Sequence, residues 1–232
     1  MVNDYALLTR LPLLQGISST DLLGWEDALR LEIDEFSASR MPLIRQGDNC
    51  SLLLWLVEGE LQREHQSADG LFAVRSVLKG PALIEVDRLF GLLPTYQNTY
   101  TPLTDVRMLG IRKSLVGSHL MKNEVFRLNL LNLLSAIAQK RQTALMPNAL
   151  FTAEERLIHF LRTLIPDGKG QVDVLVQMND LADYIGETRL TVSRLLNAWQ
   201  RQGSIRLGRA RFTILDIEAL LNQSHSHPSE AL

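Results

Sequence analysis

The chain has 232 residues, of which 46% are hydrophobic and 22% charged, and its formal net charge is −2 at pH 7. This composition is ordinary for a soluble globular protein, and the chain is long enough for two domains. The most apolar run, residues 52–57, is too short to span a bilayer, and the N-terminus shows no basic region followed by an apolar one. The single cysteine, Cys50, excludes an internal disulfide and a multi-cysteine metal site. We therefore expect a cytoplasmic protein with no membrane partner.

The first third of the chain changes from a helical to a β-rich pattern. Residues 3 to about 35 read as helices, and Ser18 with Asp21 resembles a capping box. From Phe36 onward, short β-rich runs alternate with turn signals, and Asp69-Gly70 between two runs is typical of a β-hairpin. The runs are residues 41–44, 51–65, 71–78 and 105–111. So many short strands predict an antiparallel β-roll or barrel, a shape that can enclose a small ligand.

Residues 124–145 contain neither Gly nor Pro and predict one long helix. Its apolar residues recur at alternating steps of four and three, which is the spacing of a coiled-coil seam. The predicted seam of a homodimer consists of Phe126, Leu130, Leu133 and Ile137. Leu131 and Leu134 widen the apolar stripe, so the helix can pack on its own β-domain and on a partner helix. The alternative is a core helix without a partner, because Lys140 interrupts the seam.

A break after the long helix separates the two predicted domains. Met146-Pro147-Asn148 ends the helix, and Thr152 with Glu155 forms a second capping box. Residues 172–176 read as a strand, and residues 224–232 as an unpatterned, disordered tail. His225 and His227 in this tail are expected to be solvated rather than metal ligands, and we predict no metal site.

Residues 179–202 predict two helices joined at Gly186, which supplies the positive φ of a sharp turn. The second helix has a buried stripe on one side and a basic face on the other. The buried stripe consists of Val192, Leu195, Leu196 and Trp199. This pattern is that of a helix-turn-helix that places its second helix in the DNA major groove, and the alternative is an ordinary helical hairpin.

A short β-hairpin around Gly208 follows, and it favours the DNA-binding interpretation. Residues 188–215 contain six arginines and no Asp, Glu or Lys, although the whole chain is slightly acidic. Such a local excess of positive charge is expected of a surface that binds phosphates. The predicted DNA-binding residues of the recognition helix and the wing are Thr188, Arg189, Leu190, Thr191, Ser193, Arg194, Arg201, Arg206, Arg209 and Arg211.

In this order of elements, the chain resembles the CRP/FNR family of bacterial transcription regulators. Residues 43–48 (LIRQGD) and 56–61 (LVEGEL) are similar to paired glycine motifs of the family's β-roll. Residues 185–194 (IGETRLTVSR) are similar to its recognition segment. The resemblance implies that Arg189 and Arg194 reach base edges and that Thr188 and Thr191 contact phosphates. Leu190 departs from the family's usual glutamate and can contact only a thymine methyl group, so the preferred DNA site should differ.

The sensory half departs further from the pattern of the cyclic-nucleotide-binding members. Those members hold the cyclic phosphate with a Gly-Glu pair followed by Arg-Ser. In residues 80–101 of this chain, Glu85 can stand for the glutamate, but no glycine precedes it. Arg88 is the only nearby candidate for the arginine, and a buried phosphodiester without its guanidinium is poorly compensated.

The sequence therefore predicts an α+β fold in four parts. Residues 1–122 form a β-roll effector-type domain, 123–146 a dimerisation helix, 147–223 a winged helix-turn-helix domain, and 224–232 the tail. The predicted function is a homodimeric, sequence-specific DNA-binding transcription regulator whose effector domain is degenerate or re-purposed and does not bind cyclic AMP. The alternative is a cytoplasmic ligand-sensing signalling module whose winged helix contacts proteins.

Expected partners are a palindromic double-stranded DNA, a second copy of the chain, RNA polymerase and an unidentified small-molecule effector. The sequence identifies no cofactor. It also shows no clustered nucleophile and base and no paired catalytic carboxylates, so we expect no catalytic residues and no enzyme activity.

Overall fold

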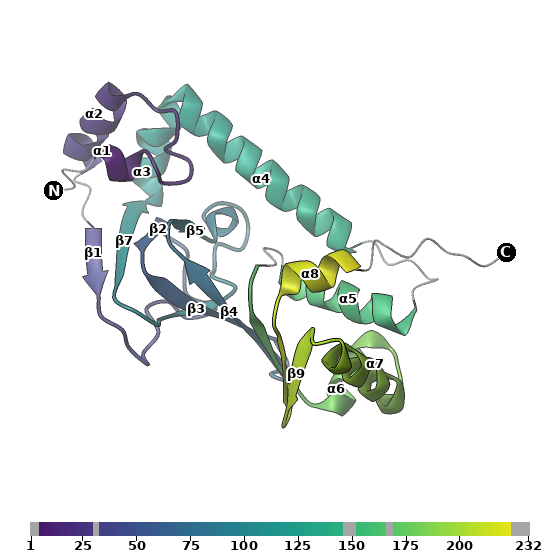
Figure 1. Ribbon diagram of the computed structural model, residues 1–232. Coiled ribbons are helices and arrows are strands. Elements are labelled where there is room, and N and C mark those ends of the chain that lie inside the picture. Colours follow the sequence, from purple (N-terminus) through teal and green to yellow (C-terminus); the bar gives the residue numbers. More distant parts are fainter. Residues whose placement is uncertain (1–4, 30–32, 146–151, 166–168, 224–232) are drawn as a thin grey trace. The chain divides into compact units, whose positions relative to one another are not determined.

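The computed structural model describes residues 5–29, 33–145, 152–165 and 169–223 (Figure 1). The chain divides into two compact units: Met1–Arg63 with Leu78–Ala138, and Glu64–Val77 with Gln139–Leu232. The fold is α+β with antiparallel sheets, which confirms the predicted class. Within the described ranges, no helix is long and apolar enough to cross a membrane.

The first unit begins with the helices α1 (Tyr5–Leu8) and α2 (Ser19–Leu29). Ser18 caps α2, because its hydroxyl accepts the Asp21 N–H at 3.1 Å and donates to the Asp21 carboxylate at 2.8 Å. The prediction of helix up to residue 35 is wrong at its end. β1 (Ile33–Phe36) is a strand that pairs antiparallel with β7 (Val106–Arg112). The four residues of β1 carry too little local pattern to reveal a strand whose partner lies about seventy positions away.

The first sheet has the strand order β1-β7-β2-β5, with β2 (Leu52–Glu58) beside β5 (Ala82–Ile84). Residues 53–57 of β2 are all buried, which explains why this strand reads as a continuous apolar run. β3 (Glu60–Gln66) and β4 (Phe72–Lys79) form the hairpin predicted at Asp69-Gly70, and β6 (Thr99–Pro102) lies beside β3. The predicted strand at residues 41–44 is reduced to one bridge between Ile44 and Tyr100.

Short helices follow the strands, and they lead into the long helix. They are η1 (Val86–Arg88), α3 (Lys113–Ser118) and η2 (Leu120–Lys122). The long helix α4 (Glu124–Leu145) has the predicted bounds and runs without a break in Figure 1. Asn123 caps α4, because its side-chain oxygen accepts the Phe126 N–H at 3.0 Å.

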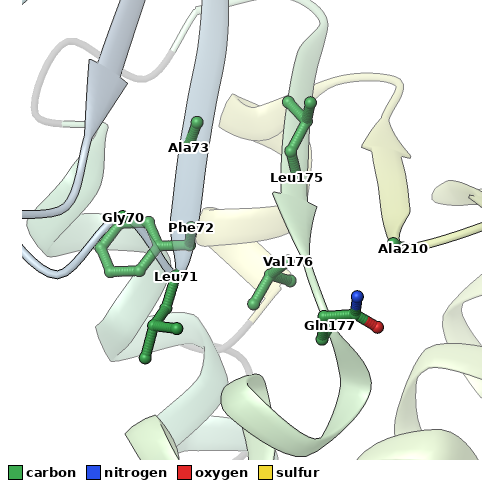
Figure 2. A pocket seen from close by; sticks show the side chains of 8 residues that line it. All are labelled: Gly70, Leu71, Phe72, Ala73, Leu175, Val176, Gln177 and Ala210. Atoms are coloured by element: carbon green, nitrogen blue, oxygen red, sulfur yellow. The ribbon is translucent and has the colours of Figure 1, made fainter.

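The second unit contains the helices α5 (Ala153–Leu164), α6 (Met178–Ile185), α7 (Arg189–Arg201) and α8 (Ile217–Gln223). Its strands follow the order β4-β8-β10-β9, with β8 (Val172–Val176), β10 (Arg211–Ile214) and β9 (Ile205–Gly208). A hollow of about 230 Å³ opens between the tip of the β3–β4 hairpin and the β9–β10 turn (Figure 2). The strand at residues 172–176 and the capping box of Thr152 and Glu155 are confirmed. α8 was not predicted, and the predicted break at residues 146–148 and the tail at 224–232 lie outside the described residues.

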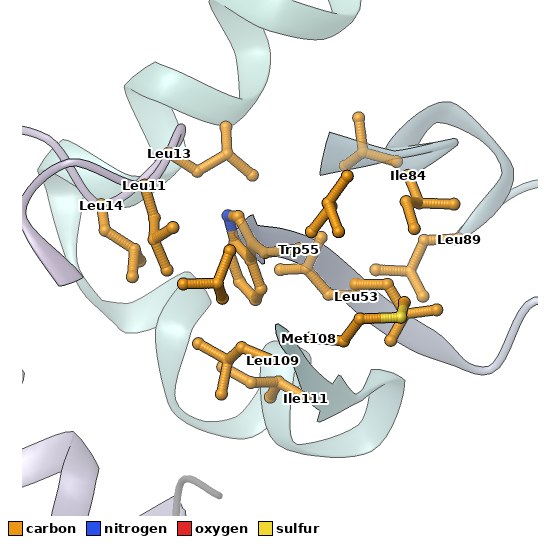
Figure 3. Close-up of a cluster of buried hydrophobic side chains, with 14 of the residues drawn as sticks. Leu11, Leu13, Leu14, Leu53, Trp55, Ile84, Leu89, Met108, Leu109 and Ile111 are labelled. Carbon is orange, nitrogen blue, oxygen red and sulfur yellow. The ribbon is translucent and has the colours of Figure 1, made fainter. Parts of the chain in front are cut away.

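Each unit has its own hydrophobic core. In the first, Trp55 is fully buried, and its indole N–H donates to the carbonyl of Pro12 at 2.8 Å, which ties the N-terminal segment to β2 (Figure 3). Cys50 is buried in the same core, and burial raises the pKa of its thiol. The thiol is therefore protonated near neutral pH and is not a reactive nucleophile.

The inward face of α4 is formed by the four residues of the predicted seam. Phe126 and Leu130 are 0% and 5% exposed within a single chain, and the ring of Phe126 packs edge-on against Trp25. Leu133 and Ile137 are partly buried against the same core. Phe126 and Leu130 already fill the core of their own unit and leave little of their surface for a partner helix, and the dimer role of the seam stays a prediction. The opposite face exposes Val125, Leu128 and Leu131.

Candidate nucleic-acid interface

α6 ends at Gly186, as predicted from the sequence. Gly186 has φ 66°, its N–H donates to the carbonyl of Asp183, and the N–H of Glu187 donates to that of Ala182 at 2.9 Å. Glycine adopts this left-handed backbone conformation at little energetic cost, and the conformation turns the chain sharply toward α7.

Thr188 caps the start of α7. Its side-chain oxygen accepts the Thr191 N–H at 3.2 Å, and the two hydroxyls lie 2.9 Å apart. The first amides of α7 and these two hydroxyls therefore gather at one helix end. Donors and the helix dipole at such an end favour an anion, so the predicted phosphate role of Thr188 and Thr191 is compatible with their positions.

α7 buries one face and exposes the other. Val192, Leu196 and Trp199 are buried, and the indole N–H of Trp199 donates to the carboxylate of Glu154 on α5 at 2.7 Å. Ser193 is partly buried, and its carbonyl accepts from the side chain of Asn197 at 2.7 Å. The exposed side chains of α7 that were predicted to contact DNA are Arg189, Leu190, Arg194 and Arg201.

The wing is the hairpin of β9 and β10, in which Ile205 pairs with Ile214 and Gly208 pairs with Arg211. The turn lies at Arg209-Ala210, one residue beyond the predicted centre at Gly208, and Ala210 has φ 52°. Ile205, Phe212 and Ile214 point into the core. The exposed side chains of the wing are Arg206, Arg209 and Arg211.

An acidic residue lies next to this basic surface, and a partly buried ion pair neutralises it. Glu187, in the turn before α7, forms an ion pair with Arg156 of α5. The Nε–H of Arg156 also donates to the carbonyl of Ile185, the last residue of α6, at 3.1 Å. Arg156 therefore holds the turn between α6 and α7 and offsets the negative charge of Glu187 beside the N-terminus of α7.

Arg156→Ala is expected to weaken binding to every DNA duplex by about 1–3 kcal/mol, because the carboxylate of Glu187 then faces DNA without its partner. The double variant Arg156→Ala/Glu187→Gln should recover most of this loss. Fluorescence anisotropy with a specific and a random duplex measures both effects. A double variant as weak as the single one would show that Arg156 acts through the turn alone.

The first unit contains the predicted effector residues, Glu85 and Arg88. The Glu85 carboxylate accepts from the N–H of Gln97 at 2.6 Å, the side chain of Asn98 at 2.5 Å and the hydroxyl of Tyr100 at 3.1 Å. The Arg88 Nε atom lies 3.5 Å from the carboxylate of Asp87. The acidic group is thus engaged by neighbouring donors, and the guanidinium by a neighbouring acid. In the described parts of the chain, no three His, Cys, Asp or Glu side chains cluster as metal ligands do.

Residues 155–222 match the family of Crp-like helix-turn-helix domains. The C-terminal part of this chain is a Crp-like helix-turn-helix domain. The resemblance to CRP/FNR regulators is confirmed by this match, which covers α5 to α8 and therefore the recognition helix and the wing. No curated protein sequence matches the chain.

Three solved structures illustrate what the chain is similar to. The catabolite activator protein of Thermus thermophilus is 22% identical with a TM-score of 0.49, covering 91% of this chain and 97% of that one. FixK2 from Bradyrhizobium japonicum is 16% identical with a TM-score of 0.48, covering 87% and 100%. DNR from Pseudomonas aeruginosa is 17% identical with a TM-score of 0.45, covering 95% and 97%.

The structure brings the predicted DNA-binding residues together on α7 and the wing of the Crp-like domain, while Glu85 and Arg88 lie in the other unit. Sequence reasoning missed Arg156, Glu187 and Tyr184 of the same domain. Arg156 follows the capping residue Glu155 directly and reads as a surface charge of an amphipathic helix. The only local signal was that Glu187 is an acid directly before the arginine-rich stretch of residues 188–215.

Proposed function

We propose that this protein is a homodimeric, sequence-specific DNA-binding transcription regulator of the cytoplasm. The observation that carries the proposal is the exposed row of arginines on α7 and the β9–β10 wing of a Crp-like helix-turn-helix domain. A recognition helix in the major groove reads base edges, while basic residues around it bind phosphates. RNA polymerase and an unidentified effector complete the proposed partners, and no catalytic step is part of the proposal.

The proposed roles follow from position on the surface. Arg189 and Arg194 read bases, because an arginine fork pairs with O6 and N7 of guanine. Leu190 is 60% exposed and offers a thymine methyl group an apolar contact. Thr188, Thr191 and Ser193 bind phosphates or the sugar, and the remaining arginines bind phosphates. Those arginines are Arg201, Arg206, Arg209 and Arg211.

The proposed dimer forms through the outer face of α4. Val125, Leu128 and Leu131 are 36%, 52% and 58% exposed, and their spacing of three places them on one stripe. Two copies of the chain can bury such an exposed apolar stripe by packing it against the same stripe of the partner in a two-fold symmetric interface. Two recognition helices about 34 Å apart would then read a palindromic site.

For the domains we propose residues 1–122 as the effector-type part, 123–146 as the dimerisation helix and 147–223 as the DNA-binding part. The compact units depart from this order at two places: residues 64–77 belong with the second unit, and the division after residue 138 falls inside α4. A helix that belongs to both units is suited to transmit a change from one to the other.

We expect no binding of cyclic AMP or cyclic GMP with a dissociation constant of about 1 mM or tighter. A cyclic phosphate needs a guanidinium and free amide donors, whereas Arg88 lies beside Asp87 and Pro94 lacks an N–H. Isothermal titration calorimetry with each nucleotide tests this expectation. DNA binding by the same protein preparation is the control for correctly folded protein. Saturable heat at micromolar nucleotide would contradict the degenerate effector site.

The alternative function, a signalling module whose winged helix contacts proteins, is separated by the salt dependence of DNA binding. A regulator that contacts several phosphates should lose about 10³–10⁵ in affinity between 50 and 200 mM salt. Filter retention of a duplex at these two concentrations, with Arg189→Ala/Arg194→Ala as the control variant, measures it. Retention that is weak at both concentrations and equal in the variant favours the protein-contacting alternative.

A further inference from the structure

The tip of the β3–β4 hairpin belongs to the same compact unit as the helix-turn-helix. β4 pairs antiparallel with β8, in a register that runs from Phe72 opposite Val176 to Ser76 opposite Val172. β8 leads directly into α6, since Gln177 is the only residue between them. The hairpin therefore extends the sheet of the DNA-binding domain at the strand that carries the first helix of the helix-turn-helix.

Aromatic side chains fasten the hairpin to the helices. Phe72 of β4 packs edge-on against Phe160 of α5 and Tyr184 of α6, with ring centroids 5.4 and 5.0 Å apart. Phe160 and Tyr184 stack on each other at 5.6 Å. Edge-to-face and offset pairs at such distances are attractive beyond the area they bury.

A carboxylate at the hairpin turn completes the contact. Asp69 accepts from the hydroxyl of Ser67 at 2.5 Å, from the N–H of Leu71 at 3.0 Å and from the hydroxyl of Tyr184. These hydrogen bonds, that of Ser67 first, lower the pKa of Asp69 to about 2. Asp69 is therefore ionised at any pH at which DNA binding is measured, and its contact with Tyr184 does not respond to pH near neutrality.

The docked tip lies at the edge of the proposed DNA-binding surface. Gly70 and Leu71 line the same hollow as Gln177, which precedes α6, and Ala210, which lies between two wing arginines (Figure 2). In a winged helix-turn-helix the phosphate backbone passes the start of the first helix and the wing. A fixed negative charge and a β-turn at this edge oppose the approach of that backbone.

The hairpin lies outside the part of the chain that matches the Crp-like family, although Phe72 and Val74 are buried in the core of the second unit. The family match begins at residue 155 and ends at residue 222, so it does not include residues 64–77. The hairpin is thus an element that this chain adds to the matched segment, and its release would expose Phe72 and the edge of β8.

We propose that the β3–β4 hairpin is an autoinhibitory element, which docks on β8 and Tyr184 and must be released before the helix-turn-helix binds DNA. The inference rests on the proposed DNA-binding function. Phe72 of the hairpin contacts a docking surface formed by Phe160, Tyr184 and the edge of β8, and Asp69 supplies the charge that opposes phosphate.

The test uses the full chain with Tyr184→Phe, which keeps the ring and removes the hydroxyl that Asp69 accepts. Hydrogen exchange should become faster at the amides of residues 72–76 and 172–176. Affinity for a DNA duplex should rise about three- to tenfold, because more molecules occupy the released state. A thermal unfolding midpoint equal to that of the wild-type protein shows that the variant folds.

A second variant, Asp69→Asn, should raise the affinity similarly. Its charge-matched control is Asp34→Asn on the exposed strand β1, which should leave the affinity within about twofold of the wild type. Faster exchange in Tyr184→Phe with unchanged or weaker DNA binding would overturn the autoinhibition. Unchanged exchange would overturn the docking contact. Absence of DNA binding in the wild type and in both hairpin variants would instead reject the proposed function itself.

Discussion

Arg194→Ala and Arg189→Ala are each expected to weaken binding to the cognate operator by about 1–3 kcal/mol, and to relax the base preference at particular positions. Both side chains are exposed on α7, whose opposite face is anchored by Val192, Leu196 and Trp199. Because the arginine can be removed without disturbing that buried face, the loss reports contacts with DNA. Competition binding against operators with single base changes measures both the loss and the relaxed preference.

Arg209→Ala at the wing turn is the matched control for this experiment. A phosphate contact carries no sequence information, so this variant should weaken all duplexes alike and reduce the salt slope by about one unit. Equal losses for Arg189→Ala, Arg194→Ala and Arg209→Ala on specific and random duplexes would contradict the assignment of base reading to α7.

Leu131→Glu is expected to convert the protein to a monomer and to weaken operator binding by about 10²–10⁴-fold. Leu131 is 58% exposed on the outer stripe of α4, and a carboxylate buried against its own symmetry mate is strongly unfavourable. A monomer reads one half-site and loses the gain of a second linked contact. Sedimentation velocity and anisotropy on a palindromic duplex measure the two effects.

Leu23→Glu on α2 is the matched control, because Leu23 is 55% exposed in the same unit but lies off the α4 stripe. It should remain dimeric and bind DNA as the wild type does. Leu130→Glu would not test the dimer, since Leu130 is buried in the core and its replacement is expected to unfold the unit. A wild-type protein that is already monomeric at micromolar concentration would contradict the dimer.

The features that the sequence determined by itself are those encoded by neighbouring residues. Gly186 ends α6 because the turn requires a left-handed backbone conformation, which glycine adopts at low energetic cost. Thr152 and Glu155 form a capping box within a single helical turn. The wing and the buried stripe of α7 follow from alternation and from helical spacing over a few residues. The arginine surface could be read because all its members lie within about thirty consecutive positions.

The features that only the tertiary structure decided depend on partners distant in the chain. β1 is a strand because β7 supplies its hydrogen bonds, and Phe126 faces inward because the core around Trp25 takes up its ring. Both faces of α4 carry apolar residues, so spacing could not tell the core face from the outer one. Arg156 finds Glu187, and Asp69 finds Tyr184, only when helices and hairpin are packed together. Periodicity records which residues share a face, whereas the identity of the surface that covers that face is set by packing of the whole domain.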